Sequence, residues 1–284
     1  MKNTIRLLCM LGAFVAGGSA AWAGEPVKRP QAPIHEYDLD NGLHVIISPD
    51  HSSPIVNVGM MYHVGSKNEP TDRTGFAHLF EHLLFHGTGN IPEGQMEVYM
   101  AAAGGYSNAS TSADRTFYYT ILPTHQYKLG LWIESERMLH PIISQSGLDR
   151  EREVVKEESR QRYDTSPLGR APEYMQAFEY GDYVYGWPVI GSMEHLNAAS
   201  LDDVQRFFKT YYVPGNACLV LTGDVDPEEC RTYVHAYFDR IPAGAPVVQP
   251  PVFQAPENRS GFLQMSIGGL SRPHLFISYA TAPE

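Results

Sequence analysis

The sequence predicts a mixed sandwich of helices and strands rather than a helical bundle or a closed barrel. Two observations support this fold class. Short runs of alternating apolar and polar residues, which are typical of half-buried strands, are interspersed with longer segments of helical periodicity. The chain of 284 residues is also long enough to bury one large core, or one core and part of a second.

Four segments have the pattern of strands. Glu36–Ser48 reads as two strands joined at Asn41-Gly42, because both of these residues tolerate the positive φ angles of a tight hairpin turn. Pro54–Val64 alternates like a single strand, and Asn108–Leu122 is extended and rich in Ser, Thr and Tyr. The fourth strand is Asn216–Thr222, which leads into a Gly-Asp turn.

Six segments have the pattern of helices. Gly87 is placed to end the first of them, and Gly104-Gly105 closes the second. Ser200 caps the fifth, with Asp203 at its third position as in a capping box. The predicted helices are Thr74–His86, Pro92–Ala103, His125–Leu139, Leu148–Arg162, Leu201–Tyr212 and Pro227–Phe238.

The first residues, Met1–Ala23, have the features of an export signal. Lys2 and Arg6 give a positive start, Leu7–Gly18 is apolar, and Ala21-Trp22-Ala23 ends in the small-x-small pattern of a cleavage site. The alternative is a buried N-terminal helix. Because the apolar run is too short to span a bilayer, we expect a periplasmic or secreted mature chain with no transmembrane segment.

Composition narrows the class of partner. The formal net charge is −11, from 21 Lys and Arg against 32 Asp and Glu, which argues against nucleic acid because a phosphate-binding surface needs clustered positive charge. Three cysteines are too few for a disulfide scaffold. Cys218 and Cys230 remain after signal removal, either bridged or as two free thiols, since pairing depends on geometry that the sequence withholds.

The composition shifts after the last predicted helix. Residues 34–240 form the N-terminal domain, and residues 241–261 read as a semi-rigid linker with few charges. The prolines of this linker are Pro242, Pro246, Pro250, Pro251 and Pro256. Residues 262–284 are too few to make a core of their own. They are either an extra strand of the first domain or the beginning of a truncated second domain, and we favour the second interpretation.

The strongest functional signal is the H-x-x-E-H pattern at residues 78–82. Residues four apart share one face of a helix, so His78 and His82 can direct ring nitrogens at one metal ion. Glu81 reaches the edge of the same site. Two histidines and a carboxylate among apolar neighbours are costly to bury without a metal or hydrogen-bond partners. The alternative is a helix with incidental surface histidines.

An acidic helix downstream offers a third ligand. Glu151, Val155 and Glu158 lie at i, i+4 and i+7 and therefore on one face. A catalytic zinc ion needs three protein ligands and an open position for water, which two histidines and one carboxylate would supply. The alternative is a solvated charged face that also includes Glu153 and Glu157. Spacing alone does not say which glutamate would bind the metal.

Several motifs in the same order resemble the pitrilysin/insulinase-type zinc peptidases with the inverted H-x-x-E-H motif. The resemblance runs from about Tyr37 to Phe238. Within the family, the sequence most resembles the branch that contains bacterial peptidases and mitochondrial processing peptidase. It is carried by GFAHLFEHLLFHGT, NASTSADRTFYY, EREVVKEE, YGWPVIG and YYVPGNACLVLTGDVDPEE. The resemblance implies an α+β fold with a mixed, mostly antiparallel sheet flanked by helices.

The resemblance also implies roles for single residues. His78 and His82 would be ligands of one zinc ion per chain, with Glu158, the last glutamate of EREVVKEE, as the third ligand. Glu81 would be the catalytic base, and Glu151 would support the metal site from behind its ligands. His86 would play a supporting or structural part, since a fourth protein ligand would close the catalytic position.

The implied substrate is a peptide. Asn108, Ala109, Ser110 and Thr111 match the edge strand of the family beside the active site, to which an extended peptide can add as one more strand. A plain sheet strand is the alternative. Family members pair this domain with a related second half, on the same chain or on a partner subunit, and together the halves form a chamber around the peptide.

The expected function is that of an exported zinc metalloendopeptidase acting on unfolded peptides or small proteins. A non-catalytic or partner-dependent peptide-binding subunit is one alternative. The zinc-dependent S-ribosylhomocysteine lyases are another, because they also carry an H-x-x-E-H helix. Their third ligand is a cysteine and they act in the cytosol, so the export signal and EREVVKEE argue against them.

Overall fold

The computed structural model describes residues 33–251 and 261–278. The predicted export signal therefore lies outside the described residues, as does part of the predicted linker. Among the described residues, none of the helices is both long and apolar enough to cross a membrane. Residues 261–278 contain turns and bends but no regular helix or strand, so they do not add a strand to the sheet.

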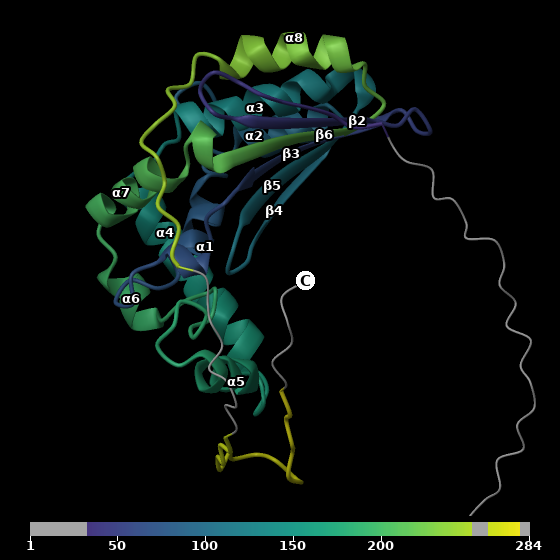
Figure 1. Cartoon of the computed structure of the whole chain (residues 1–284). Coiled ribbons are helices and arrows are strands. Elements are labelled where there is room, and N and C mark those ends of the chain that lie inside the picture. The colour runs from purple at the N-terminus through teal and green to yellow at the C-terminus, as the bar shows by residue number, and fades with distance from the viewer. Residues whose placement is uncertain (1–32, 252–260, 279–284) are drawn as a thin grey trace, which may run out of the picture. The chain divides into compact units, whose positions relative to one another are not determined.

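Six strands form a single sheet in the order β1-β2-β6-β3-β5-β4 (Figure 1). The pairing of β2 with β6 is parallel and the other four pairings are antiparallel. The sheet is thus mixed and mostly antiparallel, as expected. The strands are β1 (His35–Asp38), β2 (His44–Pro49), β3 (Ile55–Tyr62), β4 (Tyr106–Thr111), β5 (Thr116–Pro123) and β6 (Ala217–Gly223).

Two turns set the strand pairing. The predicted hairpin at Asn41-Gly42 is confirmed, with φ of 88° at Gly42. The Asn41 amide also donates to the carbonyl oxygens of Phe238 and Ile241, at 2.9 and 3.0 Å, which ties the turn to the end of the last helix. The prediction of one extended segment over Asn108–Leu122 was incomplete, because a turn at residues 112–115 folds this region into two paired strands.

Eight α-helices occur in the described part of the chain. They are α1 (Phe76–Leu83), α2 (Gln95–Ala102), α3 (Tyr127–Leu139), α4 (Gln145–Ser159), α5 (Ala171–Tyr180), α6 (Met193–Ala198), α7 (Leu201–Tyr211) and α8 (Pro227–Phe238). The predicted start at Leu148 was three residues late, because Ser144 caps α4 by accepting from the backbone N–H of Gly147. The structure adds α5 and α6, which the sequence interpretation did not identify.

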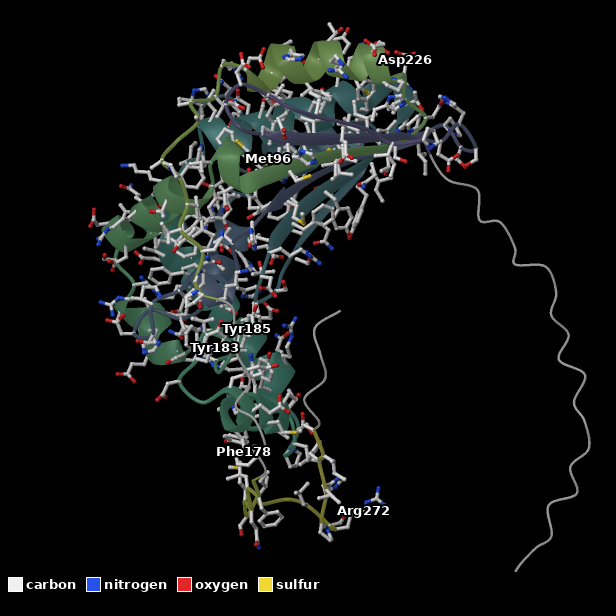
Figure 2. The ribbon with its side chains drawn as sticks, in the orientation of Figure 1. Met96, Phe178, Tyr183, Tyr185, Asp226 and Arg272 are labelled. Carbon is white, nitrogen blue, oxygen red and sulfur yellow. The ribbon has the colours of Figure 1, made fainter. Side chains whose placement is uncertain are left out.

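The core lies between the sheet and the helices that cover it. Each of the long strands alternates, and β3 buries Val56, Val58, Met60 and Tyr62 on one face. α3 packs on β3 and β5, and α8 packs on β2 beside α3 (Figure 1). Asp226 lies at the start of α8 (Figure 2). Its side chain caps the helix by accepting from two backbone N–H groups of the first turn.

α1 lies between the sheet and a second group of helices. It contacts β4 and β5 on one side and α4 and α7 on the other. Its buried apolar residues, which include Phe76, Leu79, Phe80 and Leu83, join the main core.

Cys218 on β6 and Cys230 on α8 are both free thiols, which decides between the two alternatives left open by the sequence.

Candidate metal centre

α1 presents His78 and His82 on one face, as their spacing predicts. The two imidazole rings meet edge to face with centroids 4.8 Å apart. His78 is buried, with 8% of the residue exposed, and His82 is partly exposed. The chain turns sharply just before α1, because Gly75 at the N-cap has φ of 94°, a left-handed conformation that favours glycine.

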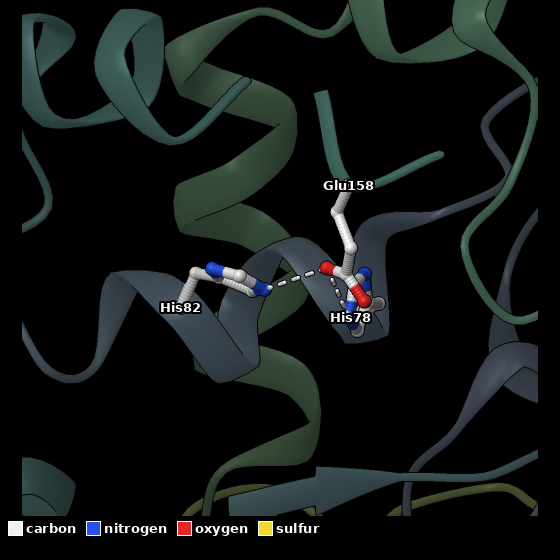
Figure 3. Close-up of side chains that lie close together, drawn as sticks. All are labelled: His78, His82 and Glu158. Atoms are coloured by element: carbon white, nitrogen blue, oxygen red, sulfur yellow. Dashed lines mark ion pairs between the residues drawn. The ribbon is translucent and has the colours of Figure 1, made fainter. Parts of the chain in front are cut away.

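α4 brings Glu158 to these histidines (Figure 3). The Oε2 atom of Glu158 lies 3.5 Å from Nε2 of His78 and 3.6 Å from Nε2 of His82. Among the described residues, one group of His, Cys, Asp or Glu could hold a metal ion, and it consists of these three side chains with ligand atoms within 4.8 Å of one another. Glu157 points away from this group and is exposed.

The donor set fits a zinc ion. Three ligand atoms each about 2.1 Å from a tetrahedral zinc ion would be about 3.4 Å apart, close to the separations between Glu158 and the two histidines. Burial lowers the pKa of His78 to about 3, so its imidazole is neutral at physiological pH. A neutral imidazole is the form that binds a metal.

Glu151 lies on the same face of α4 as Glu158 and contacts the other nitrogen of His82. Its carboxylate contacts Nδ1 of His82 at 3.2 Å and Nε2 of His86 at 2.6 Å. These hydrogen bonds outweigh burial and lower the pKa of Glu151, and the same contact raises the pKa of His82 although burial opposes it. A carboxylate on the second nitrogen of a ligating histidine fixes the orientation and tautomer of the ring.

Glu81 lies beside the three side chains without being one of them. Burial raises its pKa above the ordinary value for a glutamate, and a hydrogen bond from Thr111 offsets part of this rise. The Thr111 hydroxyl donates to Oε2 of Glu81 at 2.5 Å. A carboxylate with a raised pKa, adjacent to a metal site, is suited to accept a proton at neutral pH.

Asn108–Thr111 belong to β4, which is the terminal strand of the sheet. β4 pairs with β5 along one side only and contacts α1. The predicted edge position is therefore confirmed. The hydrogen bond from the Thr111 hydroxyl to Glu81 was not predicted from the sequence. No spacing rule connects a residue on β4 with one thirty residues earlier on α1.

Two further residues that contact the site were not identified from the sequence. Glu69 accepts hydrogen bonds from the backbone N–H groups of Gly75 and Ala77, at 2.9 and 2.8 Å, at the start of α1. Arg162 contacts the Oε1 atom of Glu158 at 2.7 Å. Both lie outside the H-x-x-E-H motif. Glu69 reaches α1 from the preceding loop, whereas Arg162 lies four residues after Glu158.

Together, the sandwich fold and two histidines and a glutamate contributed by two helices define a metallopeptidase-like domain. Residues 44–191 match the sequence profile of insulinase, peptidase family M16, and residues 198–284 match that of the M16 inactive domain. The chain belongs to this family. The second matched segment begins at residue 198, inside the first domain of residues 34–240 that the composition predicts. It contains β6, which pairs in one sheet with β2 and β3 of the first matched segment.

The relatives include proteases from bacteria and a mitochondrial enzyme. The chain is 35% identical over 215 residues to the zinc protease PqqE of Helicobacter pylori, covering 74% of this chain and 48% of the relative. It is 25% identical over 233 residues to the mitochondrial-processing peptidase subunit beta of Blastocladiella emersonii, covering 82% of this chain and 50% of the relative. The chain thus spans about half the length of these curated relatives.

Solved structures show the same fold. A protease from Helicobacter pylori matches with a TM-score of 0.72 and 31% identity, over 80% of this chain and 55% of that one. The periplasmic protease PqqL from Escherichia coli matches with a TM-score of 0.72 and 25% identity, over 79% of this chain and 26% of that one.

Proposed function

We propose that this chain contains the catalytic half of an exported zinc metalloendopeptidase that hydrolyses unfolded peptides or small proteins. The observation that carries the proposal is the convergence of His78, His82 and Glu158 beside Glu81. His78, His82 and Glu158 would hold one zinc ion. When bound there, zinc would polarise the scissile carbonyl and lower the pKa of an attacking water.

The protein's own groups supply the proton transfers and the alignment. Glu81 accepts a proton from the attacking water and passes it to the departing amine. Thr111 holds one oxygen of Glu81, which leaves the other for the water. Glu151 keeps the ring of His82 oriented so that Nε2, rather than Nδ1, faces the metal position.

The edge strand offers the substrate site. The free side of β4, over Asn108, Ala109, Ser110 and Thr111, can pair with an extended peptide through main-chain hydrogen bonds. A peptide bound in this way would lie along the strand that also orients Glu81. Such pairing selects extended, unfolded segments because it uses the backbone of the substrate.

The remaining proposals concern the rest of the molecule. Residues 34–240 would form the catalytic domain, residues 241–261 a linker, and residues 262–284 the beginning of a second related domain. That second half, on the same chain or on a partner subunit, would complete the chamber around the peptide. The signal at Met1–Ala23 would direct the chain to the periplasm, where PqqL of Escherichia coli acts as a protease.

One alternative is favoured by a specific observation. The curated relatives extend over about twice the length that matches this chain, and a partner-dependent peptide-binding subunit would need a second half of that kind for turnover. The complete group of His78, Glu81, His82 and Glu158 favours the catalytic reading, since a purely binding subunit has no need of a metal site and a base.

Cleavage of an unstructured peptide library tests the proposal. The chain is loaded with zinc, and Glu81→Gln is compared with Glu157→Gln, a matched change at an exposed position on α4. We expect Glu157→Gln to cleave like the wild type, and Glu81→Gln to retain zinc but lose turnover. Normal cleavage by Glu81→Gln would overturn the assignment of the base. If the wild type cleaves only after a second half is added, the partner-dependent alternative holds.

A further inference from the structure

The two oxygens of Glu158 have different surroundings. Oε2 faces the Nε2 atoms of His78 and His82. Oε1 faces the guanidinium of Arg162, with Nη2 at 2.7 Å. The carboxylate thus contacts the two imidazoles through one oxygen and the guanidinium of Arg162 through the other.

The backbone explains why Arg162 reaches Glu158. α4 ends at Ser159, and the chain continues through one π-helical turn over Arg160–Asp164. Residues at i and i+4 lie on the same side of a helical segment, which places Arg162 over Glu158. π-Helical turns inside helices are frequent at functional sites, and this one begins two residues after the proposed ligand.

We propose that Arg162 is a positioning residue that holds Glu158 as a one-oxygen ligand of the metal. The proposal rests on the proposed function, because it takes Glu158 to be a zinc ligand. A catalytic zinc site keeps one coordination position open for water. If both oxygens of Glu158 turned to the metal, the second would compete for that position. The guanidinium prevents this because it binds the second oxygen with a directional, charge-assisted hydrogen bond.

Two opposing effects decide the outcome of removing Arg162. Its positive charge repels a bound cation, so its loss would strengthen zinc binding. Its hydrogen bond pre-orients the carboxylate, so its loss would weaken zinc binding. The side chain of Arg162 is 57% exposed, so solvent screens its charge, whereas that of Glu158 is only 27% exposed. Orientation therefore dominates.

The expected magnitude follows from similar supporting contacts. Loss of a partner that orients a metal ligand weakens metal binding by about 10- to 100-fold. Because Arg162 is more exposed than most such partners, we expect about 10-fold, the lower end of that range.

The test compares Arg162→Met with Arg160→Met in the full chain. Arg160 is a matched control: its side chain is also 57% exposed, and it pairs with a glutamate of α4, at 2.9 Å from Glu157. Zinc affinity is measured by competition with a chelator. We expect about 10-fold weaker binding for Arg162→Met and the wild-type affinity for Arg160→Met. Equal affinities for the two variants, or tighter binding by Arg162→Met, would overturn the proposal.

The coordination itself is read from the cobalt(II) form. A carboxylate that binds through both oxygens raises the coordination number, which weakens the visible absorption of cobalt(II). We expect this loss of absorption in Arg162→Met and not in Arg160→Met. Arg162→Lys, which keeps the charge but lacks the planar fork, is expected to show an intermediate affinity. An unchanged cobalt spectrum in Arg162→Met would contradict the positioning role.

Glu158→Gln separates this inference from the proposed function. Wild-type zinc affinity in Glu158→Gln would show that Glu158 is not a ligand, and the proposed metal site would fail together with the role of Arg162. A large loss of zinc in Glu158→Gln, with no change in Arg162→Met, would leave the metal site standing and refute only the role of Arg162.

Discussion

Replacing Glu69 by alanine would remove the acceptors at the start of the helix that carries both histidines. Oε2 of Glu69 accepts from the backbone N–H of Gly75 at 2.9 Å, and Oε1 accepts from that of Ala77 at 2.8 Å. The N-cap of α1 is Gly75, which has no side chain with which to cap the helix. The carboxyl group of Glu69, from an earlier loop, performs that task.

The size of the effect follows from these two bonds. Glu69 is only 4% exposed, so the N–H groups that it satisfies are shielded from water. Each buried donor left without an acceptor costs about 1–3 kcal/mol, which gives about 2–6 kcal/mol for two. Water entering the vacated space would satisfy part of this demand. We therefore expect Glu69→Ala to lower the free energy of unfolding by about 3 kcal/mol.

Urea unfolding of the zinc-free protein at pH 7 measures this loss. Glu97→Ala is the control, because Glu97 also lies in the first turn of a helix, α2, but is exposed. We expect the control to change the free energy of unfolding by less than about 0.5 kcal/mol. If Glu69→Ala were destabilised by less than about 1 kcal/mol beyond this control, the assignment of Glu69 as the cap of α1 would be refuted.

The pH dependence of the same residue has a definite sign. Burial raises the pKa of Glu69 from 4.5 to about 8, although its backbone hydrogen bonds oppose the rise. The folded protein then binds this proton more tightly than the unfolded chain does. The stabilisation is complete below about pH 4.5 and is lost as the pH rises through about 8. Glu69→Gln, which does not titrate, should lack this step when unfolding is measured from pH 5 to 9.

Two further predictions concern Thr111, which donates to Glu81 of α1, and Arg137, which donates to the carbonyl oxygen of Leu84 at the end of α1. Thr111→Val removes the hydrogen bond to Glu81. In steady-state kinetics of a preparation that cleaves peptide, we expect about a 10-fold lower kcat with little change in KM. Thr111→Ser should restore kcat, and a rise in KM alone would indicate a substrate-binding role instead. Arg137→Met leaves the buried carboxylate of Glu134 without its partner at 2.5 Å. We expect a loss of about 3–5 kcal/mol by urea unfolding, of which the double change with Glu134→Gln should recover a part; equal losses in the single and double variants would contradict a buried ion pair.

The sequence predicted those parts of the fold that depend on short-range patterns. The Asn41-Gly42 hairpin needs only two residues that tolerate positive φ, and α1 needs only its own apolar periodicity. The sequence interpretation did not identify α5, which packs little of its surface into the core. Of its ten residues, only Ala171 is buried.

The candidate site divides in the same way. The His78 and His82 pair is local, so its geometry follows from the helical repeat. The choice between Glu151 and Glu158 is not local, because both lie on one face of α4 and spacing treats them alike. The family resemblance favoured Glu158, and the contacts with Nε2 of both histidines agree with it. Glu69 and Thr111 were missed because their contacts join α1 to other segments of the chain. The contact of Arg162 with Glu158 is local, at i and i+4, and the sequence interpretation did not identify it.

The way α1 and α4 pack explains why the two glutamates differ. Glu158 lies between His78 and His82, and Glu151 lies between His82 and His86, so the two helices run antiparallel. Each glutamate therefore contacts two histidines that are four residues apart in the sequence, and His86 lies just beyond the end of α1 at Leu83.

His82 belongs to both pairs and presents a different nitrogen to each. Its Nε2 faces Glu158, and its Nδ1 faces Glu151. Glu151 could replace Glu158 as a ligand only if the ring of His82 turned over, and its 2.6 Å contact with His86 opposes that movement because it anchors the carboxylate on the far side. The geometry that favours Glu158 as the proposed metal ligand and Glu151 as its proposed support thus follows from the shared histidine and not from any difference in the glutamates themselves.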